Sequence, residues 1–214
     1  MAEGQSGALP SRRLAWDGSI ALLLAVRHAV FFIWRPDYTN PTTARILTAL
    51  FLAASVAWLW LIYQLWLMVR GTSGDAFMRW AFIAAVASIV GPELWPWVFG
   101  GTGFATAVLM WLSTLATLTV PFLLALGARR APHGGRPFSI AALVWGVALL
   151  VRTAADFLMP FGELVTSHVF NYAATAANVA ALVALAVWLL AERRRVEQAL
   201  QTGAPKVSIE SPKD

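Results

Sequence analysis

The chain has 214 residues, of which 59% are hydrophobic and 13% are charged, and its formal net charge is +5. Soluble domains contain about 25% charged residues, and a soluble fold this apolar would expose large apolar patches to water, so the composition excludes an ordinary soluble domain. The lack of cysteine excludes disulfides, thiolate catalysis and Cys-ligated metal centres.

Three long segments contain no Asp, Glu, Lys or Arg, namely residues 46–69, 94–128 and 164–191. About 20 apolar residues cross the hydrocarbon core of a bilayer, so each segment is long enough to do so. Several tryptophans fall near expected helix ends, which is typical of an interfacial aromatic belt: Trp16, Trp34, Trp80, Trp95, Trp97 and Trp188. The sequence therefore predicts an all-α, polytopic integral membrane protein.

Taken in chain order, the pattern predicts a bundle of six transmembrane helices. Residues 1–13 are expected to form a disordered polar tail, and residues 14–195 a single transmembrane domain. A second tail, residues 196–214, is expected to follow. The helices are expected at residues 14–35, 44–69, 77–91, 104–126, 138–158 and 165–191.

Prolines and small polar residues set two of these boundaries. Thr42 or Thr43 is expected to cap the second helix. Pro92 is expected to end the third helix, because proline disfavours helical geometry in the residue before it. The segment around Trp95 and Trp97 is then expected to lie irregularly in the membrane interface.

Lys and Arg in short loops predict the orientation of the bundle. One side receives Arg12, Arg13, Arg70, Arg79, Arg129, Arg130, Arg136 and Arg193–Arg195, whereas the other receives only Arg35 and Arg45. Both termini are therefore expected to be cytoplasmic, with the chain in the plasma (cell inner) membrane. The same topology explains the positive net charge, so the partner expected is the lipid bilayer and not nucleic acid.

Charged side chains within spans usually face the bundle interior or an aqueous cavity. Arg152 and Asp156 lie four residues apart on one helix and so share a face. They are interpreted either as an intrahelical ion pair that helps insertion, or as an acid, base or cation ligand, Asp156, kept ionised by its neighbour.

A polar stripe on the last helix consists of His168, Asn171, Thr175 and Asn178, at spacings of three, four and three residues. One interpretation is that these side chains form hydrogen bonds between helices. The alternative is that they line a wet cleft, with His168 at its mouth exchanging protons or binding a metal.

Arg27 falls near the middle of the first helix and is expected to pair with a group on another helix, for which Asp156, Glu93 and the carbonyls near Pro92 are the candidates. Adjacent residues are about 100° apart on a helix, so only one of Arg27 and His28 is expected to point inward. Glu93, beside Trp95 and Trp97, is interpreted either as a solvated residue at a helix end or as a general acid.

No spacing matches a zinc-protease helix, a nucleophile elbow or a phosphate-binding loop, so no metal or cofactor is expected. The candidate catalytic residues are Asp156, Glu93 and His168. The candidate substrate-binding residues are Arg152, Asn171, Thr175, Asn178, Arg27, Trp95 and Trp97.

Three functions remain open. The first is an enzyme using carboxylate acid/base chemistry on a lipophilic substrate, such as an isoprenoid or lipid, in an outward-facing cleft. The second is a non-catalytic subunit or assembly partner, in a homo-oligomer or a larger membrane complex. The third is a channel or transporter component, although the absence of an internal repeat counts against a secondary carrier. The gathering of polar groups toward one membrane face slightly favours the enzyme.

Overall fold

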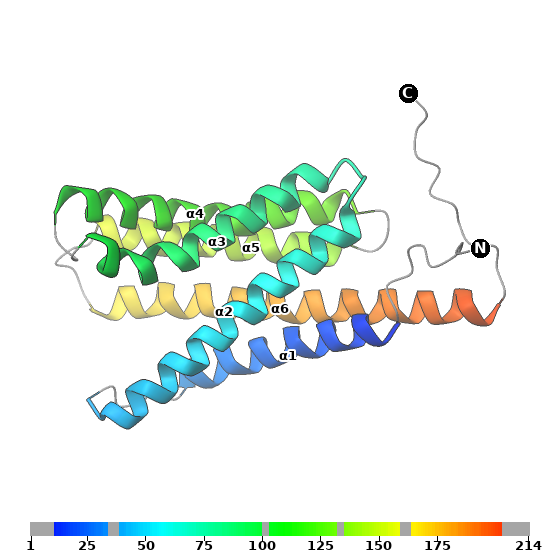
Figure 1. The fold of residues 1–214 in the computed structure, drawn as a ribbon, viewed down its shortest axis with the longest axis horizontal. Coiled ribbons are helices and arrows are strands. Elements are labelled where there is room, and N and C mark those ends of the chain that lie inside the picture. Colours follow the sequence, from blue (N-terminus) through cyan, green and yellow to red (C-terminus); the bar gives the residue numbers. More distant parts are fainter. Residues whose placement is uncertain (1–10, 34–38, 100–102, 132–134, 159–163, 203–214) are drawn as a thin grey trace.

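Six helices make up most of the described chain (Figure 1). The structure is a computed structural model and describes residues 11–33, 39–99, 103–131, 135–158 and 164–202. No strand occurs in these ranges, which confirms the all-α prediction. The helices are α1 (Ser11–Ile33), α2 (Pro41–Val69), α3 (Asp75–Phe99), α4 (Phe104–Arg129), α5 (Arg136–Leu158) and α6 (Leu164–Gln201).

The helices form a closed ring in chain order, because each packs against the next and α6 packs against α1. Consecutive helices run in opposite directions (Figure 1), so α1, α3 and α5 begin where α2, α4 and α6 end. We call this the basic end, since it carries Arg13, Arg70, Arg79, Arg129, Arg130, Arg136 and Arg193–Arg195. The other end is called the opposite end.

Five helical stretches are long and apolar enough to cross a bilayer: Arg13–Phe31, Pro41–Val69, Thr106–Arg129, Arg136–Asp156 and His168–Ala199. Many of their large apolar side chains point outward, including Leu23, Val56, Val147 and Val187. Lipid can cover such a surface, whereas its exposure to water would be strongly unfavourable. The fold therefore has the features of a helical membrane protein.

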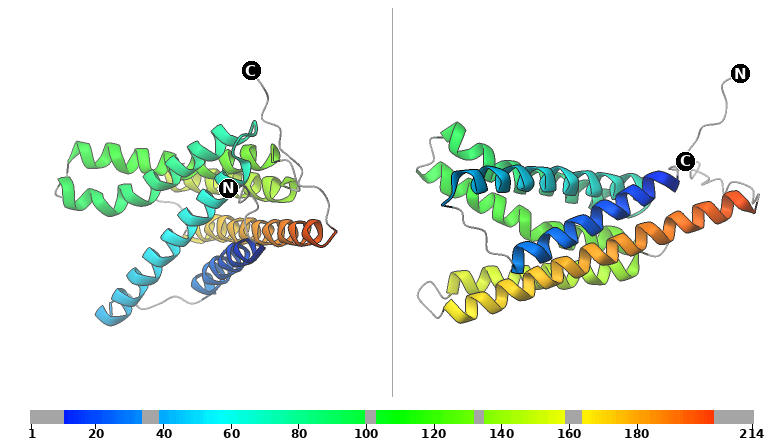
Figure 2. Two further views of the ribbon diagram at one scale, coloured as in Figure 1. Left: turned by 45° about the vertical axis from the view of Figure 1, so that its right-hand side comes forward. Right: turned by 90° about the horizontal axis from the view of Figure 1, so that it is seen from below.

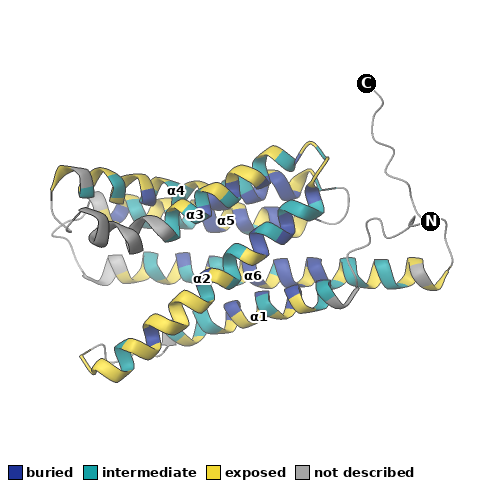
Figure 3. Cartoon of the chain, viewed as in Figure 1, coloured by how far each residue is buried: buried dark blue, intermediate teal, exposed yellow. Residues whose placement is uncertain are grey.

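The tightest packing lies toward the basic end (Figure 3), where large apolar side chains from most of the ring are fully or almost fully buried. They are Leu61, Leu65, Met78, Leu124, Phe138, Leu185 and Leu189. Toward the opposite end, the first half of α2 diverges from α3 and α4 (Figure 2), and residues 48–53 are all exposed. The bundle is thus filled at one end and more open at the other.

Aromatic side chains join α2 to α3 near the basic end. Trp66 stacks on Phe82 with ring centroids 6.2 Å apart, and Tyr63 lies 6.0 Å from the same ring. The Trp66 Nε1 group also donates a hydrogen bond of 2.6 Å to Asp75 Oδ1. These contacts hold α2 close to its neighbour only in its second half, which allows the first half to diverge.

Most helix boundaries lie within about three residues of those expected, but the residue predicted to cap α2 was wrong. Asn40, not Thr42 or Thr43, caps the helix, and its Oδ1 accepts hydrogen bonds from the backbone N–H groups of those two residues at 2.9 and 3.4 Å. Asn is a stronger N-cap than Thr, and Pro41 has the fixed φ that suits the first helical position.

The expected end of the third helix at Pro92 was also wrong, because α3 continues to Phe99. Proline removes the N–H that would bond to the carbonyl four residues earlier, which here belongs to Ser88. The Ser113 hydroxyl of α4 donates to that carbonyl oxygen at 3.2 Å. A side chain of the neighbouring helix thus replaces the lost bond, as occurs where prolines are tolerated in membrane helices.

The sixth helix continues past the expected end of the span to Gln201, so residues 196–201, which were expected in the tail, are helical. Ion pairs one turn apart stabilise this extension: Arg193 lies 2.9 Å from Glu197, and Arg195 lies 3.3 Å from Glu192. At the other terminus, residues 11–13 of the expected tail belong to α1. Residues 1–10 and 203–214 lie outside the described ranges.

Replacing Ser113 by Ala should lower the free energy of unfolding by about 0.5–2 kcal/mol, because the Ser88 carbonyl then loses its replacement donor. Unfolding in mixed micelles with increasing SDS fraction measures this change. Ser19→Ala serves as the matched control, since the Ser19 hydroxyl bonds at 3.0 Å to Ala15 O of its own helix. Equal effects of the two substitutions would contradict the role given to Ser113.

Candidate functional site

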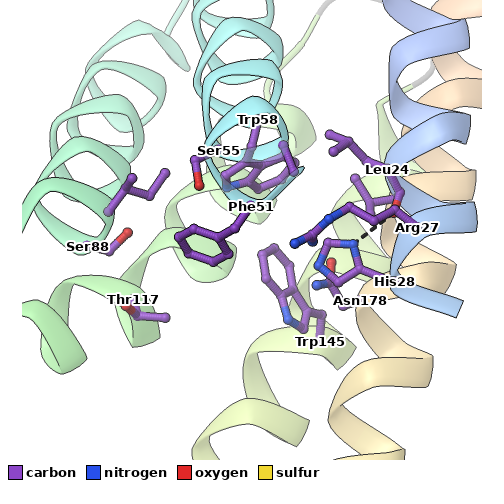
Figure 4. Close-up of a pocket in the computed structure, with 13 residues that line it drawn as sticks. Leu24, Arg27, His28, Phe51, Ser55, Trp58, Ser88, Thr117, Trp145 and Asn178 are labelled. Carbon is purple, nitrogen blue, oxygen red and sulfur yellow. Dashed lines mark hydrogen bonds between the residues drawn. The ribbon is translucent and has the colours of Figure 1, made fainter. Parts of the chain in front are cut away.

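A cavity of about 280 Å³ lies near the middle of the bundle, and all six helices contribute to its wall (Figure 4). Its polar wall residues are Arg27, His28, Ser55, Ser88, Thr117 and Asn178, and its aromatic wall residues are Phe51, Trp58 and Trp145. Ligand pockets are usually about 300–1,000 Å³, so this central cavity has room for a small molecule or for the polar head of a larger one.

Arg27 brings a positive charge into the wall. Its guanidinium carbon lies 4.9 Å from the centroid of the Phe31 ring and 5.9 Å from that of Phe51. Both distances are within the range of cation–π attraction, which stabilises a charge beside apolar surroundings. Phe51 also lines the cavity. Arg27 thus lies in the wall of the central cavity, beside aromatic rings of α1 and α2.

His28 also lines the cavity, so the expectation that only one of these neighbours would face inward was wrong. The diverging first half of α2 leaves enough width for both to reach the wall. His28 Nδ1 lies 2.8 Å from the Leu24 carbonyl oxygen (Figure 4). A carbonyl only accepts, so Nδ1 carries the proton, and Nε2 of the neutral ring is a hydrogen-bond acceptor.

The side of the cavity nearer the basic end is apolar. Trp58 of α2 and Trp145 of α5 meet edge to face inside the ring of helices, with the centroids of their aromatic rings 5.8 Å apart and an interplanar angle of 72°. On their respective helices, Leu24 and Leu182 are the wall residues nearest the basic end. Arg27, His28 and Asn178 lie closer to the opposite end. The wall of the cavity is therefore apolar toward the basic end and polar toward the opposite end.

Arg152 and Asp156 form the expected pair, with Nε and Oδ2 3.6 Å apart, but they lie outside the central cavity. Their side chains remain 42% and 47% exposed, in a separate groove of about 370 Å³ between α4 and α5. Thr117 belongs to the walls of both the groove and the central cavity. The structure therefore does not place Asp156 beside Arg27 or Asn178.

The polar stripe of α6 divides among different surroundings. His168 is exposed and stacks on Tyr172, with ring centroids 6.3 Å apart. Asn171 is half-buried, and Thr175 lines a groove on the outside of α1 and α6. Asn178 alone reaches the central cavity. Positions on one helical face thus differ in their surroundings, from the exposed surface to the outer groove and the central cavity.

Glu93, Trp95 and Trp97 fall in the final turns of α3, and their side chains lie outside the described part of the structure. No group of three His, Asp or Glu side chains among the described residues is arranged to hold a metal ion.

A polar contact between α1 and α2 that includes a buried carboxylate was missed from the sequence. Asp17 is 1% exposed, and its Oδ1 accepts a hydrogen bond of 2.9 Å from Trp60 Nε1. The Arg13 guanidinium lies over the same indole, 5.4 Å from its centroid. Gln64, one turn beyond Trp60, is also 1% exposed. Asp17, the one acidic residue of the first helix, was the signal that could have identified this contact.

The described wall of the central cavity contains a guanidinium, an imidazole, an amide, hydroxyls and aromatic faces, but no carboxylate. This set suits an anionic or hydrogen-bonding head group whose apolar part contacts the tryptophans. Comparisons with protein families, with curated proteins and with solved structures found no match for this chain. The candidate site therefore rests on its geometry.

Replacing Trp60 by Phe should lower the free energy of unfolding by about 1–3 kcal/mol, because it removes the donor to a fully buried Asp17. The combined variant with Asp17→Leu should be less destabilised than the sum of the two single variants, since both partners are then apolar. SDS titration of all three variants tests this coupling.

Trp66→Phe is the matched control for that experiment. It also breaks a Trp–Asp hydrogen bond, but Asp75 is the first residue of α3, and its side chain is 26% exposed and lies 3.8 Å from Arg79. The control should cost less than Trp60→Phe. Additive effects of Trp60→Phe and Asp17→Leu would show that the buried hydrogen bond is not a coupled pair.

Proposed function

We propose that the chain is a plasma-membrane protein whose central cavity binds the anionic head of a lipophilic molecule entering from the opposite end of the bundle. The observation that carries this proposal is that all six helices meet around one cavity with Arg27 in its wall. A charged residue within a membrane span commonly marks a functional site. The cation–π contacts of Arg27 keep its charge at the cavity and away from lipid.

In this proposal all six helices span the membrane, and both termini are cytoplasmic. The place of α3 in the ring, between α2 and α4, supports its inclusion as a sixth span. The collection of arginines at one end of the bundle supports a cytoplasmic location for that end. The cavity then opens toward the outer leaflet.

The size of the cavity and the course of α2 favour a long amphiphile over a small soluble anion. A volume of about 280 Å³ accommodates a head group and a few carbons, but not a long acyl or isoprenoid chain. The chain would leave past the first half of α2, where residues 48–53 have few neighbours. Apolar chains on that route would lie in contact with the bilayer itself.

Acid/base chemistry on the bound head group would be performed by His28 rather than by a carboxylate. The fixed hydrogen bond at Nδ1 leaves Nε2 as the basic nitrogen in the cavity wall. Asp156 lies in the α4–α5 groove, which shares only Thr117 with the described cavity wall. A channel function receives less support, because buried residues such as Leu61, Leu124 and Leu185 fill the bundle between cavity and basic end.

A role as an assembly partner is the second candidate, and it is favoured by a groove of about 580 Å³ on the outer surface of α1 and α6. Small residues dominate its wall: Ala29, Thr175, Ala176, Ala180 and Ala184. Small side chains let the backbones of membrane helices approach closely. A helix of a second chain could therefore pack in this groove while the central cavity remains occupied.

Arg27→Gln should weaken the binding of dodecyl phosphate by about tenfold or more, because a hydrogen bond to a charged group contributes about 1.5–3 kcal/mol. It should leave the binding of dodecanol nearly unchanged. Equilibrium binding of both radiolabelled compounds to the protein in nanodiscs, corrected for empty nanodiscs, measures the difference. Equal affinity of wild type and variant for the phosphate would refute the role of Arg27.

Ala54→Phe should abolish binding of both compounds, since Ala54 lines the cavity and a larger side chain fills it. Ala87→Phe is the matched control, because Ala87 of α3 is exposed, is not among the cavity wall residues and lies outside the proposed exit route at residues 48–53. Binding that survives Ala54→Phe, or that is lost equally in both variants, would place the bound compound elsewhere.

The assembly role can be tested by crosslinking, because the natural chain contains no cysteine. In native membranes Ala180→Cys, in the α1–α6 groove, should form a disulfide-linked dimer under mild oxidation if a second copy packs there. Val147→Cys, on the exposed face of α5, should remain monomeric. Equal dimer yields at both positions would indicate random collisions and would exclude a homodimer through this groove.

A further inference from the structure

We propose that a second groove, between α5 and α6 at the basic end, binds one anionic glycerophospholipid of the adjoining leaflet. The groove has a volume of about 250 Å³ and is lined by Pro137 of α5 and by Val187, Trp188, Ala191 and Arg195 of α6, among others. This site depends on the membrane location of the chain, but it does not depend on the ligand of the central cavity.

The course of the groove along α6 matches the change in polarity along a lipid molecule, from apolar acyl chain to polar head group. It extends along α6 from Ala184 to Arg195, which is about 16 Å at 1.5 Å per residue. Val187 and Ala191 supply an apolar wall along this length, and Trp188 is 5% exposed and stacks on Phe138 of α5 at 5.8 Å. An acyl chain could lie along this wall, with its head group beside Arg195.

The length of α6 places Arg195 at head-group level. The helix has 38 residues, which is about 57 Å, whereas about 20 residues cross the hydrocarbon core. Its last turns must therefore project beyond the core. The uncharged stretch of α6 ends at residue 191 and charged residues follow from Glu192, so the groove passes from hydrocarbon to water along its length.

Charge selects an anionic lipid as the occupant. Arg136 adjoins the groove residue Pro137, and Arg194 adjoins Arg195. Neither Arg136 nor Arg194 forms an ion pair among the described side chains. Glu192 also lines the groove, but it already pairs with Arg195 at 3.3 Å. The surplus of positive charge at the mouth favours a phosphodiester without a compensating ammonium group, and basic pockets at this membrane level commonly bind such lipids.

The test is native mass spectrometry of the whole chain released from nanodiscs that contain equal amounts of phosphatidylglycerol and phosphatidylcholine with the same acyl chains. Wild type should retain one phosphatidylglycerol in preference to phosphatidylcholine. The variant with Arg136→Ala and Arg195→Ala should lose this preference by about fivefold or more, given the attraction of each arginine to anionic lipid. Val187→Trp, which fills the apolar wall, should reduce retention of the lipid while leaving the charges in place.

The matched control combines Arg70→Ala with Arg79→Ala, which removes the same charge from the same end of the bundle but from the residue that follows α2 and from α3. This control should retain phosphatidylglycerol like wild type, and so should the cavity-filling variant Ala54→Phe. Equal losses in the two arginine pairs would show general surface attraction and overturn the site. Retention unaffected by Val187→Trp, or a protein chain bound in place of lipid, would also overturn it.

Discussion

The structure depends on one constraint, which is that a polar group surrounded by hydrocarbon is costly unless the protein itself supplies a partner. The carbonyl left without its helical donor by Pro92 receives one from Ser113 of the adjacent helix. The carboxylate of Asp17 receives one from Trp60. The charge of Arg27 lies over two phenylalanine rings. Each solution joins neighbouring parts of the ring, so the polar groups help to fix which helices pack together.

Uneven packing along the bundle explains why the cavity lies where it does. Large side chains fill the ring near the basic end, and α2 is held against α3 there by Trp66 and Phe82. Its first half then diverges (Figure 2), which widens the ring at mid-depth. The cavity at this level is closed toward the basic end by the edge-to-face pair of Trp58 and Trp145. The same packing therefore leaves the bundle open toward the opposite end and closed toward the basic end.

Apolar length and charge asymmetry were enough to predict the helices, because both properties are local to each segment. The inward position of Arg27 was also predictable, since a charge at mid-helix has few alternatives. The stripe from His168 to Asn178 was less informative, because a shared helical face does not identify the neighbour that covers it. Pro92 misled for a related reason: its effect on α3 depends on Ser113, which only the folded ring brings near. Asp17 required knowledge of its partner Trp60, 43 positions away in sequence.

α6 connects the separate surfaces, and its length determines how they are spaced. Asn178 faces the cavity, Ala180 the outer α1–α6 groove, and Arg195 the mouth of the lipid groove. The place of each residue around and along the helix sets the surface that it faces. One straight helix therefore places Asn178 at mid-membrane and Arg195 at the level of the head groups. The ion pair between Arg193 and Glu197 keeps the last turns helical beyond the apolar core. Loss of helicity in those turns would move Arg195 away from the groove without changing the cavity, so the two surfaces are separable although they share one helix.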